Sequence, residues 1–101
     1  MKAVILTKPT ESTEVKISEY PTPAVKPGWV LVRIKSFGMN HSEQILRKSE
    51  ISAPYIQKPI IPGIECAGEI ADASDTALTA VKKLIALMGG MGREFHGSYA
   101  E

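Results

Sequence analysis

Side chains able to do chemistry gather in one short segment, Asn40 to Glu43. The segment combines an amide, an imidazole, a hydroxyl and a carboxylate, which together can donate, accept or carry a proton. Asn40 is also a favoured helix-capping residue, and Glu43 follows three positions later, as in a capping box. The segment therefore predicts the start of a helix over residues 41–48. A capping role and a binding role for Asn40 both stay open, whereas His41 is expected to be exposed and Glu43 to act as the capping partner.

Two other features contain residues that could take part in chemistry, but we interpret them as structural. Cys66 is the single cysteine, so it cannot form an internal disulfide or a multi-thiolate metal site, and we expect a small buried residue. The glycines at positions 89, 90 and 92 do not have the spacing of a phosphate-binding fingerprint, and no helical pattern follows them. They predict a turn. His96, in the same glycine-rich segment, is expected to be solvated.

Hydrophobic alternation predicts a mainly β chain with one or two short helices, arranged as a barrel or a sandwich. Strands are expected over residues 3–6, 15–19, 29–37, 63–70 and 81–88. In the clearest of them, one face should hold Val30, Val32, Ile34 and Ser36. Trp29 and Phe37, at the two ends of that strand, are expected in the core. Residues 53–62 contain three prolines and predict an irregular surface loop.

Length and charge exclude several classes of function. A chain of 101 residues forms one domain at most, and 44% hydrophobic with 23% charged residues is ordinary for a globular domain. The formal net charge of +1 gives no electrostatic footprint for a nucleic acid. No apolar run approaches the roughly 20 residues of a membrane span, and no signal peptide is visible. We therefore expect no nucleic-acid or membrane partner and a cytoplasmic location.

Four segments in order, MKAVILT, GWVLVRIKSFGMNHSE, IPGIECAGEI and GSYAE, give the chain its resemblance to a known family. It resembles the N-terminal domain of medium-chain dehydrogenases and reductases, and within them the quinone oxidoreductase-like branch. The resemblance implies a GroES-like distorted β-barrel over residues 1–101, on the substrate side of the enzyme. It also implies a nucleotide-binding Rossmann domain that this chain does not contain. The full-length protein is expected to be a homodimer whose contacts that second domain largely makes.

The resemblance also implies the absence of zinc. Asn40 aligns with the zinc-ligand cysteine of the alcohol dehydrogenases, and Ile64 aligns with the histidine of their Gly-His-Glu motif. Glu65 is the one aligned group left, whereas a catalytic zinc needs about three protein ligands. One segment departs from the family, because Val81 to Ile85 stands where Gly-Asp-Arg-Val is usual.

The function implied by the resemblance is NAD(P)H-dependent reduction of a quinone or an enone without zinc. Asn40, His41 and Ser42 are the expected substrate-binding residues, and Asn40 is also the expected contact to NADPH or NADH. A fragment of 101 residues should be inactive alone and should bind no cofactor tightly. The alternative is a GroES-like structural or small-molecule-binding module without redox activity.

Overall fold

The computed structural model describes all 101 residues. Its single α-helix, α1 (His41–Lys48), has the predicted bounds, and η1 (Ser12–Glu14) and η2 (Glu50–Ser52) are short 3₁₀ turns. The predicted strands all occur, with shifted ends: β1 (Lys2–Val4), β2 (Ile17–Glu19), β3 (Leu31–Phe37), β4 (Glu65–Asp72) and β5 (Lys83–Leu87). None of the helical segments is long and apolar enough to cross a membrane.

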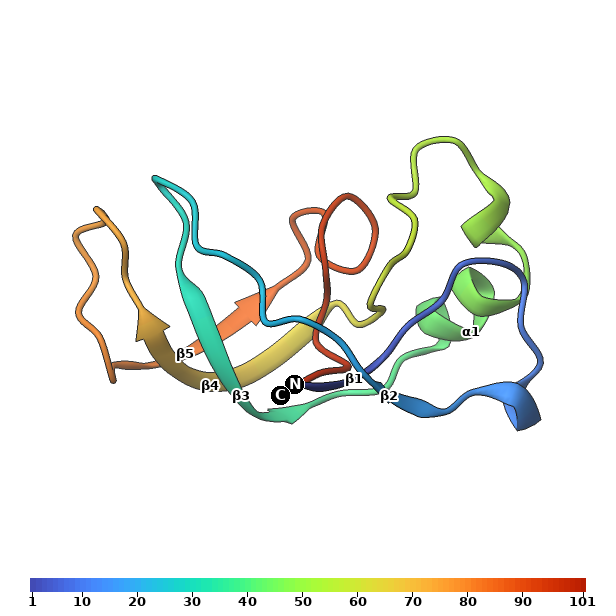
Figure 1. Ribbon diagram of the computed structural model, residues 1–101, viewed down its shortest axis with the longest axis horizontal. Helices are drawn as coiled ribbons and strands as arrows, with labels where there is room; N and C mark the ends of the chain where they lie inside the picture. Colours follow the sequence, from blue (N-terminus) through green and yellow to red (C-terminus); the bar gives the residue numbers. More distant parts are fainter.

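The strands form two antiparallel sheets that the end of the chain joins. One sheet has the order β3-β4-β5, and the other consists of β1 and β2. The two termini lie side by side near the middle of the molecule, between β3 and β1 (Figure 1), where Ala3 forms a bridge with Ala100. Glu101 then accepts a hydrogen bond from the Ile34 N–H at 2.9 Å. The last residues thereby connect β1 with β3 and draw the two sheets into one distorted barrel.

A β-bulge in β3 changes which face of the sheet the side chains after it occupy. Ile34 pairs with Gly68, but Ser36 pairs with Ala67 and Phe37 with Cys66, so the register shifts across Lys35. The prediction that Ser36 shares a face with Val32 and Ile34 is therefore wrong. The extra residue of a bulge inverts the alternation beyond it, because side chains alternate strictly from one face to the other.

The core lies away from the three-stranded sheet, between α1 and the long connection to β4. Its buried cluster consists of Leu6, Leu46, Ile51, Ile56 and Ile60. The prediction of a surface loop over residues 53–62 is wrong for Ile56 and Ile60, which are 3% and 0% exposed. Ile60 exchanges two backbone hydrogen bonds of 2.9 Å with Leu6. This pairing holds the irregular segment against the first strand and buries its isoleucines.

The aromatic ends of the strand predicted over 29–37 are not in the core. Trp29 is 45% exposed and Phe37 is 42% exposed, which corrects the prediction. Trp29 packs edge-on against Phe95 at 4.9 Å, and Phe37 packs against Tyr99 at 4.7 Å between ring centroids. Each ring thus packs against one aromatic partner and stays partly exposed to solvent. Cys66, in contrast, is buried as expected, and burial raises the pKa of its thiol.

Candidate functional site

A hollow of about 400 Å³ opens between the first strand, the start of α1 and the end of the chain. Of the residues expected to bind ligand, Asn40 and His41 line the hollow, whereas Ser42 does not. The other lining residues are Val4, Leu6, Ser12, Val15, Met39, Glu43, Gln44, Arg47, Pro62 and Tyr99. The lining therefore combines apolar side chains with the polar groups of α1.

The predicted capping box fixes the start of α1 at this hollow. The Asn40 N–H donates to Glu43 Oε2 at 2.5 Å, and the Asn40 side chain lies against the Glu43 N–H. Glu43 is only 5% exposed, and its carboxylate also accepts from Ser42 Oγ at 3.3 Å and the Tyr99 hydroxyl at 3.5 Å. A buried carboxylate needs such donors to replace water. Glu43 thus holds Asn40, Ser42 and Tyr99 in one arrangement.

The Asn40 side chain keeps a free hydrogen-bond donor. Its Nδ2 atom is buried and has no hydrogen-bond partner. A buried donor without an acceptor costs about 1–3 kcal/mol, which an incoming acceptor oxygen could recover. Asn40 is thus the helix cap expected from the sequence, with an amide group left over for a ligand.

Two basic side chains of α1 lie at the hollow. His41 is exposed, as expected, and its Nδ1 lies 3.1 Å from Gln44 Oε1. Arg47 donates through Nη1 to the Thr10 carbonyl at 2.8 Å, and the Thr10 N–H donates back to the Arg47 carbonyl at 3.0 Å. Arg47 makes no ion pair within the chain. From the sequence, a surface role at the C-terminal end of the helix is favoured for Arg47 over a contact with a substrate carboxylate or phosphate, whereas its place at the hollow follows from a contact with Thr10 across 37 residues.

Tyr99 is a further polar residue of the lining, and the sequence alone does not single it out as a site residue. Burial, followed by the charge and the hydrogen bond of Glu43, raises the pKa of Tyr99 to about 12. Its hydroxyl therefore keeps its proton at neutral pH and can act as a donor. The one signal in the sequence was the position of Tyr99 within the GSYAE segment, which carried part of the family resemblance.

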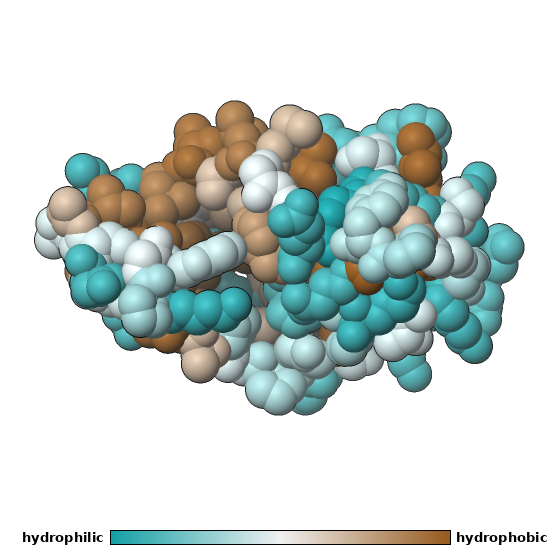
Figure 2. All heavy atoms as spheres, turned by 90° about the horizontal axis from the view of Figure 1, so that it is seen from above, coloured by the Kyte–Doolittle hydropathy of each residue, from teal (hydrophilic) through white to brown (hydrophobic).

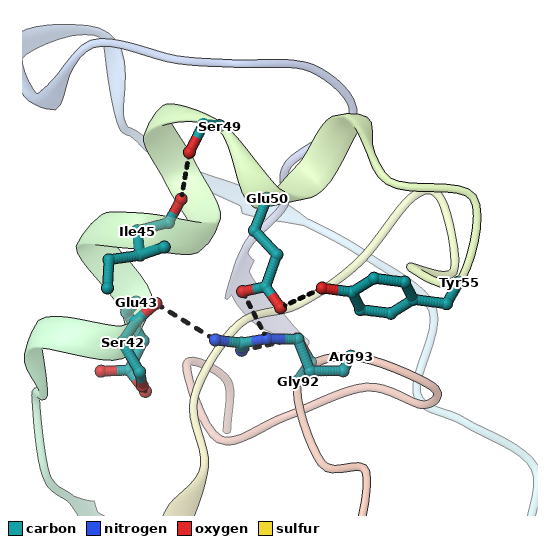
Figure 3. Close-up of polar contacts among 8 residues, drawn as sticks. All are labelled: Ser42, Glu43, Ile45, Ser49, Glu50, Tyr55, Gly92 and Arg93. Atoms are coloured by element: carbon teal, nitrogen blue, oxygen red, sulfur yellow. Dashed lines mark hydrogen bonds and ion pairs between the residues drawn. The ribbon is translucent and has the colours of Figure 1, made fainter.

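Ser42 is held outside the hollow by its backbone. Its carbonyl oxygen accepts a hydrogen bond of 3.1 Å from Arg93 Nη2 (Figure 3). Arg93 belongs to the glycine-rich segment after β5 and also contacts Glu50, which follows α1. His96, from the same segment, is half-buried rather than solvated, which corrects its prediction. Its Nδ1 accepts from the Ile61 N–H at 3.2 Å, and its Nε2 lies 3.2 Å from the Tyr20 hydroxyl.

Comparisons with known proteins agree with this architecture. Residues 26–101 match the family described as the alcohol dehydrogenase GroES-like domain. The crystal structure of the yhdH oxidoreductase from Salmonella enterica in complex with NADP superimposes with a TM-score of 0.65 and 20% identity. That match covers 100% of this chain and 31% of the other chain. It confirms the predicted GroES-like fold.

Two curated relatives are similar over most of the chain. Sorbitol dehydrogenase from Bacillus subtilis (strain 168) is 33% identical over 72 residues, which are 70% of this chain and 20% of the relative. The mouse synaptic vesicle membrane protein VAT-1 homolog-like is 28% identical over 76 residues, 75% of this chain and 18% of that protein. The chain thus spans about a fifth of the length of these relatives. With a family match over residues 26–101, the chain belongs to the alcohol dehydrogenase GroES-like domain family, the N-terminal domain of medium-chain dehydrogenases and reductases.

Proposed function

We propose that this chain is the substrate-side domain of an NAD(P)H-dependent oxidoreductase that reduces an enone or a quinone without zinc. The observation that carries the proposal is the buried, unpartnered Nδ2 of Asn40, a residue that lines the hollow. A carbonyl oxygen of the substrate or the nicotinamide ribose supplies the acceptor that this amide lacks. Bound NADPH or NADH would supply the hydride for the β-carbon of an enone or for a quinone, and solvent would supply the proton that completes the reduction.

In this proposal the residues of the hollow orient the substrate and exclude water. Asn40 holds the carbonyl oxygen, and the Glu43 carboxylate fixes the backbone of Asn40 through its N–H. Val4, Leu6 and Pro62 form the apolar wall that keeps water from the reacting carbon. His41 lies at the exposed side of the hollow, where it can contact a polar part of the substrate. Ser42 contacts the substrate only if its hydroxyl turns away from Glu43.

The cofactor and the absence of zinc belong to the proposal as well. Asn40 and Ile64 stand at the aligned positions of two zinc ligands of the alcohol dehydrogenases, and the described residues contain no group of three or more metal-binding side chains. An oxygen of the nicotinamide ribose could accept a hydrogen bond from Asn40 Nδ2. Tight binding of a dinucleotide requires the Rossmann domain of a longer protein. We place that protein in the cytoplasm as a homodimer.

The test is a titration of the isotope-labelled 101-residue chain with cyclohex-2-enone and with 1,4-benzoquinone, followed by NMR. We expect the side-chain amide signals of Asn40 to shift, because Nδ2 gains an acceptor. The Asn40→Asp variant identifies those signals, since its side chain has no amide hydrogens. Lys48→Ala, at the exposed end of the same helix, is the matched control and should leave the shifts unchanged.

Activity is measured on a version that continues through the following coding sequence. NADPH oxidation in the presence of either acceptor should occur, and the Asn40→Asp change should reduce it strongly. Shifts at Asn40 without any NADPH oxidation would favour the alternative, a small-molecule-binding module without redox activity. Asn40 signals that respond to neither compound would contradict the proposed substrate site.

A further inference from the structure

The outer edge of β5 presents backbone groups without partners. The Met88 N–H donates to the Ile64 carbonyl at 2.7 Å, and the Ile70 N–H donates to the Lys82 carbonyl at 3.0 Å. In an antiparallel ladder the backbone groups of successive residues point to opposite sides. Even-numbered residues of this segment therefore face β4. Lys83, Ile85 and Leu87 direct their N–H and C=O groups to the open edge, where no further strand lies.

The side chains around this edge are unusually apolar for an exposed strand. Ile85 is 75% exposed and Leu87 is 65% exposed, and the flanking Val81 and Met88 are 72% and 64% exposed. In the space-filling view, hydrophobic residues gather over the half of the molecule that holds the three-stranded sheet, whereas the half with α1 is mainly hydrophilic (Figure 2). Natural sheets rarely leave an apolar edge open, because such an edge pairs with another strand.

We propose that the β5 edge binds β5 of a second copy of this chain, antiparallel, about a twofold axis at Ile85. In this register Ile85 faces Ile85 of the second copy, and Lys83 faces its Leu87. In this twofold arrangement Lys83, Ile85 and Leu87, whose backbone groups point outward, all pair with residues of the second copy. The two three-stranded sheets then form one continuous sheet, and the contact is isologous, as in most homodimers.

The side chains that this register brings together are compatible with one another. On the outer face, Glu69 neighbours Lys83, and Glu65 neighbours Leu87. The row across the interface is then Glu69 and Lys83 of one copy, followed by Leu87 and Glu65 of the other. No like charges lie directly opposite each other, and the central row contains only Ala67 and Ile85 from each copy.

The opposite face and the surface beside the edge also suit a second copy. On the inner face Leu84 meets Ala86, which keeps apolar groups together. A hollow of about 580 Å³ on this sheet is lined in part by Lys83 and Ile85, next to the open edge. Both faces of the joined sheet are thus compatible with this one partner.

Sedimentation equilibrium of the 101-residue chain should show a dimer that the Ile85→Lys variant converts to a monomer. Ile85 is exposed, so the variant should keep its fold, which far-UV circular dichroism checks. Ile17→Lys is the matched control, because Ile17 is a 71% exposed isoleucine on β2. It should leave the dimer intact. Loss of the dimer in both variants, or a monomeric wild-type chain, would overturn the proposal.

Cross-linking tests the register itself. Opposed residues of a hydrogen-bonded antiparallel pair have Cα atoms about 5.5 Å apart, which a disulfide can span. Ile85→Cys should therefore form a covalent dimer under mild oxidation, whereas Ile17→Cys should not. The native Cys66 is 6% exposed and will not compete. Hydrogen exchange should show protection of the amides of Lys83, Ile85 and Leu87 that grows with chain concentration. Protection that is independent of concentration means that the chain itself covers the edge, and it would refute the dimer.

Discussion

Arg93 Nε donates a hydrogen bond of 2.9 Å to Glu50 Oε1, which joins the glycine-rich segment after β5 to the turn after α1. Both side chains are largely buried, with 17% and 23% of their surface exposed. The Tyr55 hydroxyl donates to the other carboxylate oxygen of Glu50 at 2.6 Å, and Arg93 Nη2 reaches the Ser42 carbonyl (Figure 3). This ion pair therefore holds the first turn of α1, which carries the candidate site.

Replacement of Arg93 by alanine should lower the free energy of unfolding by about 2 kcal/mol, because it leaves the Glu50 carboxylate partly buried and unpaired. Urea denaturation measures the loss. Arg33→Ala is the matched control, since Arg33 is exposed on β3 and makes no ion pair. A double-mutant cycle with Glu50→Ala should show strong coupling. Additive losses would mean that the two side chains act independently.

Local signals in the sequence predicted the helix well and the barrel strands approximately. Asn40 and Glu43 act within one turn, so the start of α1 needed no knowledge of distant contacts. The bulge at Lys35 had no such signal, because one extra residue in a strand depends on how β4 pairs with it. Burial of Ile60 was likewise hidden, since it follows from hydrogen bonds to Leu6.

Local sequence signals indicate only the part of the hollow that lies in a single segment. Asn40 and His41 line the hollow, whereas the sequence favours a surface role for Arg47 and gives Tyr99 no role of its own. Their positions result from contacts with Thr10 and Glu43 across 37 and 56 residues. Periodicity describes which face a residue occupies, but it does not tell which distant segment meets that face.

His96 should make the stability of the chain depend on pH. Burial lowers the pKa of His96 below its ordinary value of 6.5, and its Nδ1 accepts the Ile61 N–H only when it carries no proton. Below pH 6.5 the unfolded state therefore binds more protons than the folded state. Stability should be fully present above this pH and should decrease as the pH falls toward the folded pKa.

The decrease in stability is measured as the midpoint of urea unfolding at pH values from 8 to 5. The His96→Gln variant should lose the part of the slope below pH 6.5 that His96 causes, because glutamine does not titrate. His41→Gln is the control, since His41 is exposed at the start of α1. An unchanged slope in His96→Gln would show that other groups cause the pH dependence.

Val81 occupies a backbone conformation that favours glycine. Its φ is +66°, and its N–H and the Lys82 carbonyl both bond to Ile70 of β4, which is the pattern of a bulge. This is the segment in which the family usually has Gly-Asp-Arg-Val. Val81→Gly should leave the stability nearly unchanged, because relief of about 1–2 kcal/mol of β-carbon strain at positive φ offsets the roughly 1 kcal/mol that a glycine costs through the freer unfolded chain. The exposed valine side chain loses little burial.

Thermal or urea unfolding compares Val81→Gly with the matched variant Val15→Gly. Val15 has a φ of −69°, so Val15→Gly removes the same side chain without relieving any strain. It should destabilise the chain by about 1 kcal/mol through the greater freedom of the unfolded state. Equal destabilisation by both variants would show that the conformation of Val81 is not strained.

Gly97 and Gly63 cross at a distance that excludes a side chain. A β-carbon at Gly97 would lie 2.2 Å from the Gly63 carbonyl oxygen and 2.6 Å from that of Pro62. Both obstacles are backbone atoms, and Gly97 N–H also donates to the Ile61 carbonyl at 2.7 Å, so the segment cannot move aside. Gly97→Ala should therefore destabilise the chain by about 3 kcal/mol.

Gly28→Ala separates this steric effect from backbone strain. Gly28 has a φ of +81°, but nothing lies within 4 Å of a β-carbon there. Its replacement should cost only about 1 kcal/mol, the penalty of a left-handed conformation. Urea unfolding of the two variants gives the comparison. A smaller loss for Gly97→Ala than for Gly28→Ala would mean that the crossing near Ile61 can open, and Ser98 and Tyr99 would then be less firmly held beside Glu43.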